Sequence, residues 1–241
     1  HTEIMLKDFG ANISINYKNN KKIISIEGKK ELISKNINVP SDLSSSAFFI
    51  VATLINKNSI IKLNNINVNP TRNGILLALE MMGANIKYIN KRKVNSEKIC
   101  DMIVESSNLK GCELSSDMAK LMIDEYPILS VAAAFADSPS IFRGLGELRV
   151  KESDRLELIK YNLLKCGVKC KIDGDDLTIH PYEGSNNSKI DIKTNFDHRI
   201  AMAFAIIGSK IGPVNINQSE CINTSFPTFV KEFNKIGGNI S

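Results

Sequence analysis

Four charged residues lie close together in the middle of the chain, and their types are those that bind anions and move protons. They are Lys151, Glu152, Asp154 and Arg155. Two neighbouring cations can hold a phosphate or a carboxylate, especially at the positively charged start of a helix. Glu152 is a carboxylate held beside those cations, so it is a candidate proton donor or acceptor. Taken alone, the cluster is also compatible with a solvated helix start.

The residues after this cluster have the spacing of an amphipathic helix. Apolar side chains recur at positions 156, 159, 163 and 164, which places them on one buried face. Ser153 is the predicted N-cap, and Gly167 is predicted to end the helix as a C-cap glycine. The charged side chains therefore crowd around the N-terminal end of this helix.

Three further predicted helices begin at acidic residues and are apolar on almost all sides. They cover residues 42–55, 124–136 and 197–207, and helices of this kind are buried. The first begins with ordinary capping residues, so we interpret its start as structural. The second begins with Asp124 and Glu125, and the third carries His198 and Arg199 directly after its first residue.

These helix starts would form a site if they met the charged cluster at one edge of the protein. Lys151, Arg155 and Arg199 would then clamp an anion. Of the two carboxylates, Asp124 and Glu152, one would take a proton and the other would supply one. The combination is more specific than any one of these residues alone.

A helix that ends in glycine and turns into a strand occurs four times in the chain. The glycines are Gly10, Gly83, Gly167 and Gly237, so successive copies are 73, 84 and 70 residues apart. This spacing is too regular for chance and too long for a solenoid repeat. Strands are predicted at residues 23–26, 59–63, 102–106, 140–143, 177–179 and 214–216. The pattern predicts a repeated α/β unit with buried helices and outward-facing sheets.

The repeat also suggests where the chain divides. Three full units are predicted from about residue 39 to the end, with a lobe boundary at Pro40-Ser41. Residues 1–39 would close an earlier lobe, and residues 40–241 would form a C-terminal lobe of three repeat units. The chain begins at His1, in what resembles the end of a helix, so we expect sequence before it. Polar residues at 17–22, 90–98 and 183–189 are predicted to be exposed turns.

Composition excludes several classes of protein. The 241 residues are 43% hydrophobic, which allows a substantial core. The net charge of +5 comes from scattered lysines, and nothing resembles a nucleic-acid-binding motif, whereas a phosphorylated small substrate would use the same charge. The five cysteines and three histidines lack the spacing of a metal site or a disulfide framework, which favours a reducing cytoplasm. We find no run of 18 apolar residues, so no membrane span is predicted.

Five strings of residues, in order along nearly the whole chain, resemble the second half of the 5-enolpyruvylshikimate-3-phosphate synthase family, in particular its glyphosate-tolerant bacterial branch. The strings are Asn69-Pro-Thr-Arg-Asn-Gly74, Ile123-Asp-Glu-Tyr-Pro-Ile128, Leu148-Arg-Val-Lys-Glu-Ser-Asp-Arg155, Asp197-His-Arg-Ile-Ala-Met202 and Thr224-Ser-Phe-Pro227. The resemblance implies an enolpyruvyl transferase lobe: an α/β fold of repeated βαβαββ units with three-fold pseudo-symmetry around buried helices. It also implies an active site in the cleft between two such lobes.

The resemblance implies a reaction as well as a fold. The enolpyruvyl group of phosphoenolpyruvate would be transferred to the 5-hydroxyl of shikimate 3-phosphate through a tetrahedral intermediate, with release of phosphate. This is a step of aromatic amino-acid biosynthesis by the shikimate pathway. No metal or organic cofactor is expected, and we expect a cytoplasmic monomer with no nucleic-acid or membrane partner.

Roles for individual residues follow from the same resemblance. Asp124 would hold shikimate 3-phosphate and accept the hydroxyl proton, with Lys151 as a neighbouring contact. Glu152 would be the acid/base that protonates the methylene carbon. The residues that would bind phosphoenolpyruvate are Arg155, Arg199 and His198.

The sequence departs from the family pattern in two places. Thr224 stands where other members have a lysine, so one cation on phosphoenolpyruvate is absent or supplied elsewhere. The N-terminal Lys-Ser pair and further arginines of the family are not in these 241 residues, so we expect this chain alone to be inactive.

Two other functions remain open. One is the enolpyruvyl transferase that acts on UDP-N-acetylglucosamine, although that family lacks the Lys-Glu-Ser-Asp-Arg string and relies on a loop cysteine. The other is a non-catalytic, anion-binding half. Asp124 together with Glu152 favours an enzyme, because a binding module needs the cations and not that pair.

Overall fold

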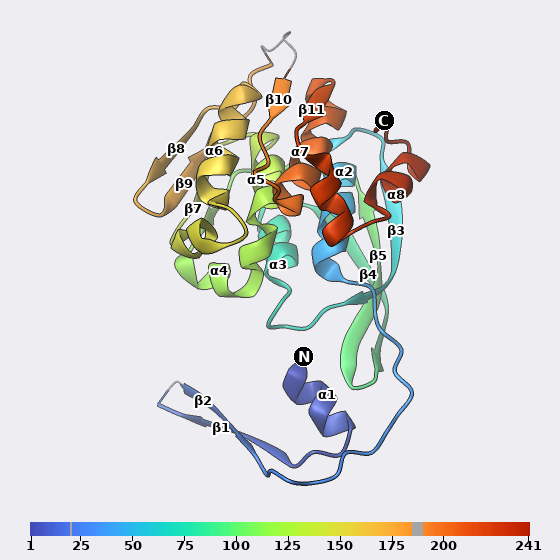
Figure 1. Ribbon diagram of the computed structural model, residues 1–241. Coiled ribbons are helices and arrows are strands. Elements are labelled where there is room, and N and C mark those ends of the chain that lie inside the picture. The colour runs from blue at the N-terminus through green and yellow to red at the C-terminus, as the bar shows by residue number, and fades with distance from the viewer. Residues whose placement is uncertain (20, 185–189) are drawn as a thin grey trace.

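Three apolar helices form the centre of the protein. The computed structural model describes residues 1–19, 21–184 and 190–241. The central helices are α2 (Leu43–Ile55), α5 (Tyr126–Ala134) and α7 (His198–Ile211), and each packs against the other two (Figure 1). Every residue of α5 is buried, as is all of α2 except Ser45. The three buried helices predicted from the sequence are therefore confirmed.

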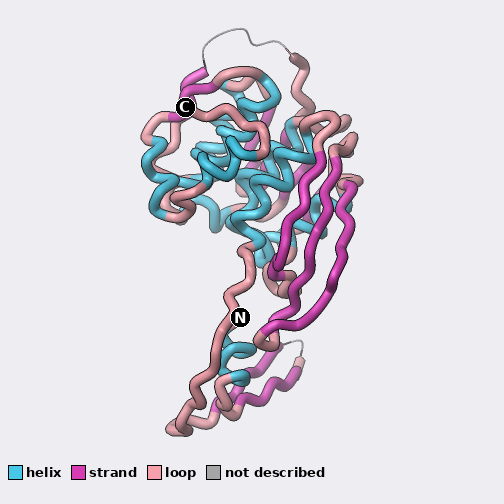
Figure 2. The backbone as a smooth tube through the Cα atoms, turned by 90° about the vertical axis from the view of Figure 1, so that its right-hand side faces the viewer, coloured by secondary structure: helices cyan, strands magenta, loops and turns pink. Residues whose placement is uncertain are grey.

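The strands lie outside this helical centre (Figure 2). One sheet has the order β3-β5-β4 and packs on α2; a second has the order β6-β7-β9-β8 and packs on α5 through β9; β10 and β11 pair beside α7. Their bounds are β3 (Ile60–Asn67), β4 (Asn85–Val94), β5 (Glu97–Glu105), β6 (Glu113–Leu114), β7 (Ser140–Phe142), β8 (Cys170–Asp173), β9 (Asp176–Ile179), β10 (Ile190–Ile192) and β11 (Val214–Ile216). The α/β fold predicted from the sequence is confirmed.

The order of strands is the same around each central helix. The segment before each helix pairs in parallel with the strand after it, as β6 with β7, β10 with β11, and Ser41 with Ile66 in β3. Antiparallel pairs β4-β5 and β8-β9 then complete the first two units. After β11 comes α8 (Phe229–Lys235), and residues 236–241 contain no strand. The division of residues 40–241 into three repeat units therefore stays a prediction.

The four repeated glycines end helices for a backbone reason. They follow α1 (Thr2–Asp8), α3 (Gly74–Met81), α6 (Arg155–Lys165) and α8, and their φ angles are between 79° and 102°. Glycine adopts this left-handed conformation without the strain that a Cβ causes. After α3, for example, the Ala84 N–H donates to the Leu79 carbonyl at 3.0 Å, which satisfies a free helix-end acceptor. The predicted strand follows the first three glycines but not Gly237.

The first part of the chain lies apart from the helical centre. It contains α1 and the antiparallel hairpin β1 (Ile13–Lys18) and β2 (Lys21–Ile26). Figure 1 shows these elements below the central body, joined to it by the irregular segment before α2. Two polar side chains, His1 and Glu97 of β5, connect α1 to the body with a 2.6 Å contact.

The three predicted polar turns have different outcomes. Within residues 17–22, β1 ends at Lys18 and β2 begins at Lys21, so the connection between the two strands lies inside the predicted turn; position 20 lies outside the described residues. Residues 90–98 are not one turn, because β4 continues to Val94 and β5 begins at Glu97. Only Asn95 and Ser96 form the turn, both with positive φ, which is the geometry of a tight hairpin. Of residues 183–189, positions 185–189 lie outside the described residues.

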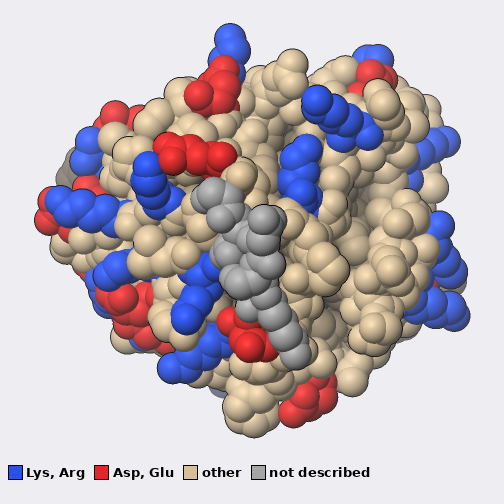
Figure 3. Space-filling model, turned by 90° about the horizontal axis from the view of Figure 1, so that it is seen from above, with Lys and Arg blue, Asp and Glu red and all other residues tan. Residues whose placement is uncertain are grey.

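Charge and hydropathy of the described residues add two observations. On the face seen from above, Lys and Arg side chains are spread over the surface among acidic and uncharged residues (Figure 3). No helix in the described part of the chain is both long enough and apolar enough to cross a membrane.

The remaining short helices are α4 (Ser116–Met122) and the 3-10 helices η1 (Ile123–Glu125), η2 (Gly146–Val150) and η3 (Ser219–Thr224).

Candidate active site

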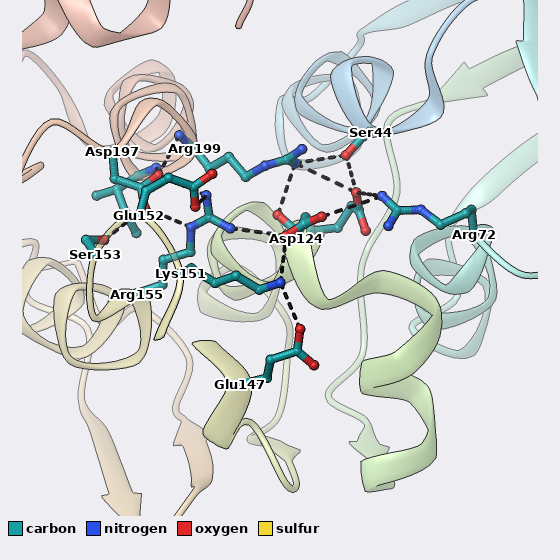
Figure 4. A network of polar contacts seen from close by, with 12 residues as sticks. Ser44, Arg72, Asp124, Glu147, Lys151, Glu152, Ser153, Arg155, Asp197 and Arg199 are labelled. Carbon is teal, nitrogen blue, oxygen red and sulfur yellow. Dashed lines mark hydrogen bonds and ion pairs between the residues drawn. The ribbon is translucent and has the colours of Figure 1, made fainter. Parts of the chain in front are cut away.

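The N-terminal ends of four helices meet at one end of the helical centre. Ser44 lies in the first turn of α2, Asp124 lies in η1 just before α5, Arg155 is the first residue of α6, and Arg199 is the second residue of α7. Figure 4 shows these side chains pointing toward one another. The convergence predicted from the sequence is therefore confirmed, and helix N-termini gathered in this way favour bound anions.

Aspartates cap three of these helices. Asp42 accepts from the Ser45 N–H at 2.8 Å, Asp154 from the Glu157 N–H at 3.0 Å, and Asp197 from the Arg199 N–H at 2.9 Å. The prediction that Ser153 is the N-cap of α6 is wrong, because Asp154 occupies that position. The Ser153 hydroxyl instead donates to Asp197 at 2.8 Å, which ties the start of α6 to the start of α7.

Arg155 is at the centre of the site and contacts three carboxylates. Its Nε donates to Asp197 at 2.8 Å, and its terminal nitrogens lie 3.2 Å from Asp124 and 2.5 Å from Glu152. Only 1% of the Arg155 side chain is exposed. One buried guanidinium therefore brings together Asp124 and Glu152, the two carboxylates predicted to transfer protons.

Asp124 is surrounded by cations. One of its oxygens lies 3.7 Å from Lys151 Nζ, the other lies 3.6 Å from Arg72, and its backbone carbonyl accepts from Arg199 at 3.1 Å. Burial raises the pKa of Asp124, but the positive charges of Arg199, Lys151, Arg155 and Arg72 outweigh it and hold this pKa below its ordinary value. Asp124 is therefore ionised at neutral pH and can accept a hydrogen bond from a substrate hydroxyl.

Glu152 lies on the solvent side of the site. The Glu152 side chain is 54% exposed, whereas Asp197, on the other side of Arg155, is completely buried. An anion that competes for Arg155 would therefore displace Glu152 rather than Asp197. Lys151 also contacts Glu147 at 2.8 Å, on the outer side of the cluster (Figure 4).

His198 is half-buried at the first position of α7. Burial lowers its pKa, and the charges of Arg199 and Arg155 lower it further, while Asp197 and Glu152 act in the opposite direction. The imidazole is therefore neutral at pH 7, and it lies close enough to these four residues for their charges to act on it.

Three residues of the site had no role assigned from the sequence: Ser44, Arg72 and Glu125. The Ser44 hydroxyl donates to Glu125 and accepts from Arg199 at 2.8 Å. The first helix start, which we interpreted as structural, therefore contributes Ser44 to the hydrogen bonds of the cluster. Glu125 is 2% exposed and lies 3.7 Å from both Arg72 and Arg199. Burial raises the pKa of Glu125, and the Ser44 hydrogen bond and the two arginines offset this only in part.

A cavity of about 300 Å³ adjoins the site on one side. Its lining includes Ser44, Arg72 and Glu125 together with residues 37–43, but not Lys151, Glu152 or Arg155. The cavity is therefore a neighbour of the charged cluster and not its centre.

The side chain at position 224 and the arrangement of possible metal ligands also bear on what the site can bind. Thr224 lies in η3, and its hydroxyl donates to the Cys221 carbonyl at 2.7 Å, so it makes a local helix contact in place of the family lysine. Among the residues that the structure describes, no group of His, Cys, Asp and Glu side chains is arranged to hold a metal ion.

Comparison with known proteins identifies similar sequences and folds. The family described as EPSP synthase (3-phosphoshikimate 1-carboxyvinyltransferase) matches residues 1–233. The 3-phosphoshikimate 1-carboxyvinyltransferase of Paramagnetospirillum magneticum is 43% identical over 100% of this chain and 54% of its own length. That of Petrotoga mobilis is 44% identical over 98% of this chain and 54% of its own length. The chain therefore spans about half the length of these curated relatives.

Solved structures agree with the sequence comparisons. An EPSP synthase from Acinetobacter baumannii has a TM-score of 0.90 and 38% identity, and the match covers 100% of this chain and 55% of that protein. The enolpyruvyl transferase NikO from Streptomyces tendae has a TM-score of 0.68 at 16% identity, over 98% of this chain and 52% of that protein. The second likeness concerns the fold alone.

Proposed function

The chain belongs to the EPSP synthase (3-phosphoshikimate 1-carboxyvinyltransferase) family, and from this premise we propose that it forms part of an enzyme that transfers the enolpyruvyl group of phosphoenolpyruvate to shikimate 3-phosphate. The observation that carries the proposal is the position of Asp124 and Glu152 on one guanidinium, that of Arg155. A site for binding alone would need the cations but not two carboxylates held side by side.

In the proposed reaction, the two carboxylates have different tasks. Asp124 accepts the proton of the 5-hydroxyl as its oxygen attacks the enol carbon of phosphoenolpyruvate. Glu152 donates a proton to the methylene carbon, which becomes a methyl group in the tetrahedral intermediate. Glu152, now a carboxylate, then takes a proton back from the methyl group as phosphate leaves, which forms the enolpyruvyl product. The low pKa of Asp124 and the exposure of Glu152 support this division, since one is held ionised and the other can reach a bound substrate.

The cations bind the two anionic substrates. Lys151 lies beside Asp124 and contacts shikimate 3-phosphate, while Arg155 and Arg199 hold phosphoenolpyruvate with His198 next to them. Arg155 and Arg199 lie at the N-termini of α6 and α7, which supports this role, because the helix dipoles and the fixed cations favour the same charge on a ligand. No metal or organic cofactor takes part in the proposed reaction.

The proposed enzyme also needs residues outside this chain. Residues 1–39 close one lobe, residues 40–241 form the other, and substrates bind between them. The half-length match to the curated relatives supports this arrangement. By this proposal the 241 residues alone do not turn over substrate. The monomeric state and the cytoplasmic location stay predictions.

The proposal is tested by the choice of acceptor. The natural protein that contains this chain is incubated with phosphoenolpyruvate and either shikimate 3-phosphate or UDP-N-acetylglucosamine. Phosphate release is measured, and the product is identified by mass spectrometry. We expect release with shikimate 3-phosphate only. Release with UDP-N-acetylglucosamine instead would reject the proposed acceptor, and binding of both substrates without release would favour a non-catalytic half.

A further inference from the structure

Ser44 is a small, buried residue at the meeting point of three helices. It lies in the first turn of α2 and is 6% exposed. Its hydroxyl contacts Glu125, just before α5, and Arg199, in the first turn of α7. One hydroxyl group therefore connects the starts of all three central helices (Figure 4).

The direction of each hydrogen bond follows from the groups involved. An arginine side chain has no acceptor, so Ser44 can only accept from Arg199. Its single hydrogen is then left for the Glu125 carboxyl, the partner to which it donates. Glu125 is almost completely buried, and this is the one hydrogen bond that its carboxyl makes among the described residues. Glu125 therefore fixes the Ser44 hydroxyl with its lone pairs toward Arg199.

Among the described residues, the Arg199 side chain is held through one nitrogen, Nη1. This atom donates to Ser44 at 2.8 Å and to the Asp124 carbonyl at 3.1 Å. Within the described part of the chain, these are the hydrogen bonds of the Arg199 side chain. The donors on Nε and Nη2 are thus left for a ligand, and two such N–H groups match a carboxylate or a phosphate in a bidentate arrangement.

A carboxyl group at position 125 is difficult to explain by stability alone. Burying an ionisable group is costly, and a buried charged network is weak grounds for a stabilising role, because apolar residues of similar volume often do as well. The buried carboxyl is explained if the hydrogen bonds from Glu125 through Ser44 hold an arginine that binds the substrate.

From these contacts we propose that Ser44, oriented by Glu125, is a positioning residue for Arg199. It fixes Nη1 so that Nε and Nη2 face the anionic group of phosphoenolpyruvate. Ser44 does not itself touch the substrate. This inference rests on the proposed function, and it adds a specific residue that controls affinity for one of the two substrates.

The test compares two neighbouring serines of the same helix turn. In the natural protein that contains this chain, Ser44→Ala removes the acceptor for Arg199. Ser45→Ala is the matched control, because the Ser45 hydroxyl bonds only to Asp42 among the described residues. We expect Ser44→Ala to raise the KM for phosphoenolpyruvate about tenfold, with kcat changed less than about threefold. Ser45→Ala should leave both constants at the wild-type values, and Ser44→Thr, which keeps the hydroxyl, should restore most of the affinity.

A double-mutant cycle with Arg199→Ala shows whether Ser44 acts through Arg199. Arg199→Ala alone should raise the KM for phosphoenolpyruvate, and adding Ser44→Ala should change it further by less than about twofold. An undiminished Ser44→Ala effect in that background, or a wild-type KM in Ser44→Ala, would overturn the inference. If Arg199→Ala itself left the KM unchanged, the proposed function would be at fault instead. Should Ser44→Ala fold poorly by thermal unfolding, Ser44→Gly removes the same hydroxyl and is used in its place.

Discussion

Arg155 and Asp197 form an almost completely buried ion pair, in which Arg155 Nε lies 2.8 Å from an Asp197 oxygen. Asp197 also caps α7, and Arg155 is the first residue of α6. The pair therefore fixes two of the helix starts relative to each other. Because Arg155 also contacts Asp124 and Glu152, the stability of the fold and the arrangement of the proposed site depend on the same guanidinium.

Removing Arg155 should therefore cause a large loss of stability. Arg155→Met leaves Asp197 buried without its cation, and breaking a buried pair in this way costs about 3–5 kcal/mol. Chemical unfolding in urea measures the change. The control is Arg143→Met, since Arg143 also contacts two carboxylates, Glu113 and Asp176, but on the surface. We expect its effect to be much smaller, and equal losses for the two variants would contradict a structural role for the buried pair.

Asp197 should make the stability of the protein depend on pH in the acidic range. Burial raises the pKa of Asp197, but the hydrogen bond and charge of Arg155, with help from Ser153, lower it below the ordinary value of 3.8. A carboxyl whose pKa is lower in the folded state stabilises the fold above its unfolded pKa, about 3.9. That stability is lost as the pH falls through the lower, folded-state pKa.

The expected result concerns the slope of stability against pH. Between about pH 5 and pH 3, the free energy of unfolding should fall less steeply in Asp197→Asn than in the wild type, because Asn cannot take up the proton. Urea unfolding at a series of pH values measures both slopes. Parallel slopes would show that Asp197 does not contribute to the acid sensitivity.

The sequence predicted those features that depend on local backbone preference and on apolar spacing. The glycines at 10, 83, 167 and 237 could be recognised because a helix end with positive φ strongly favours glycine. The buried helices could be recognised because they are apolar on nearly all sides. Since the same helices repeat with similar loops between them, the meeting of their charged starts at one end could be inferred as well.

Features that depend on tertiary contacts were harder to predict. The sequence does not reveal the burial of Glu125, whose neighbour Asp124 is partly exposed, or the contact between Ser44 and Arg199, which are 155 residues apart. The choice of Asp154 over Ser153 as N-cap depends on where α6 begins, within one residue. The hairpin of β4 and β5 extends through a polar stretch because pairing between the strands, rather than apolar content, holds it.

The repeated glycines give a prediction about backbone strain. Gly83 has a φ of 82°, and a Cβ at this position would have no atom within 4 Å. Gly83→Ala should therefore destabilise by strain alone, by about 1 kcal/mol, and Gly83→Asn by less, because Asn tolerates the left-handed conformation. Gly74 is the contrasting case, since a Cβ there would lie 2.8 Å from Leu121 and 2.9 Å from Met122. Urea unfolding should show that Gly74→Asn has no higher free energy of unfolding than Gly74→Ala. If the Asn variant were the more stable one at both Gly74 and Gly83, strain from positive φ would not explain the difference between the two positions.

Glu152 provides the most direct test of the proposed chemistry. In the natural protein that contains this chain, Glu152→Gln keeps the size of the side chain and an oxygen that can accept from Arg155, but it cannot donate a carboxyl proton to the methylene carbon. We expect kcat to fall by about a hundred- to ten-thousand-fold, which is the usual contribution of general acid catalysis, with a smaller change in KM for either substrate. Glu147→Gln is the matched control, because Glu147 contacts Lys151 from the outer side of the site. Steady-state phosphate release is measured for both variants. If Glu152→Gln turned over as fast as Glu147→Gln, Glu152 would not be the residue that transfers the proton.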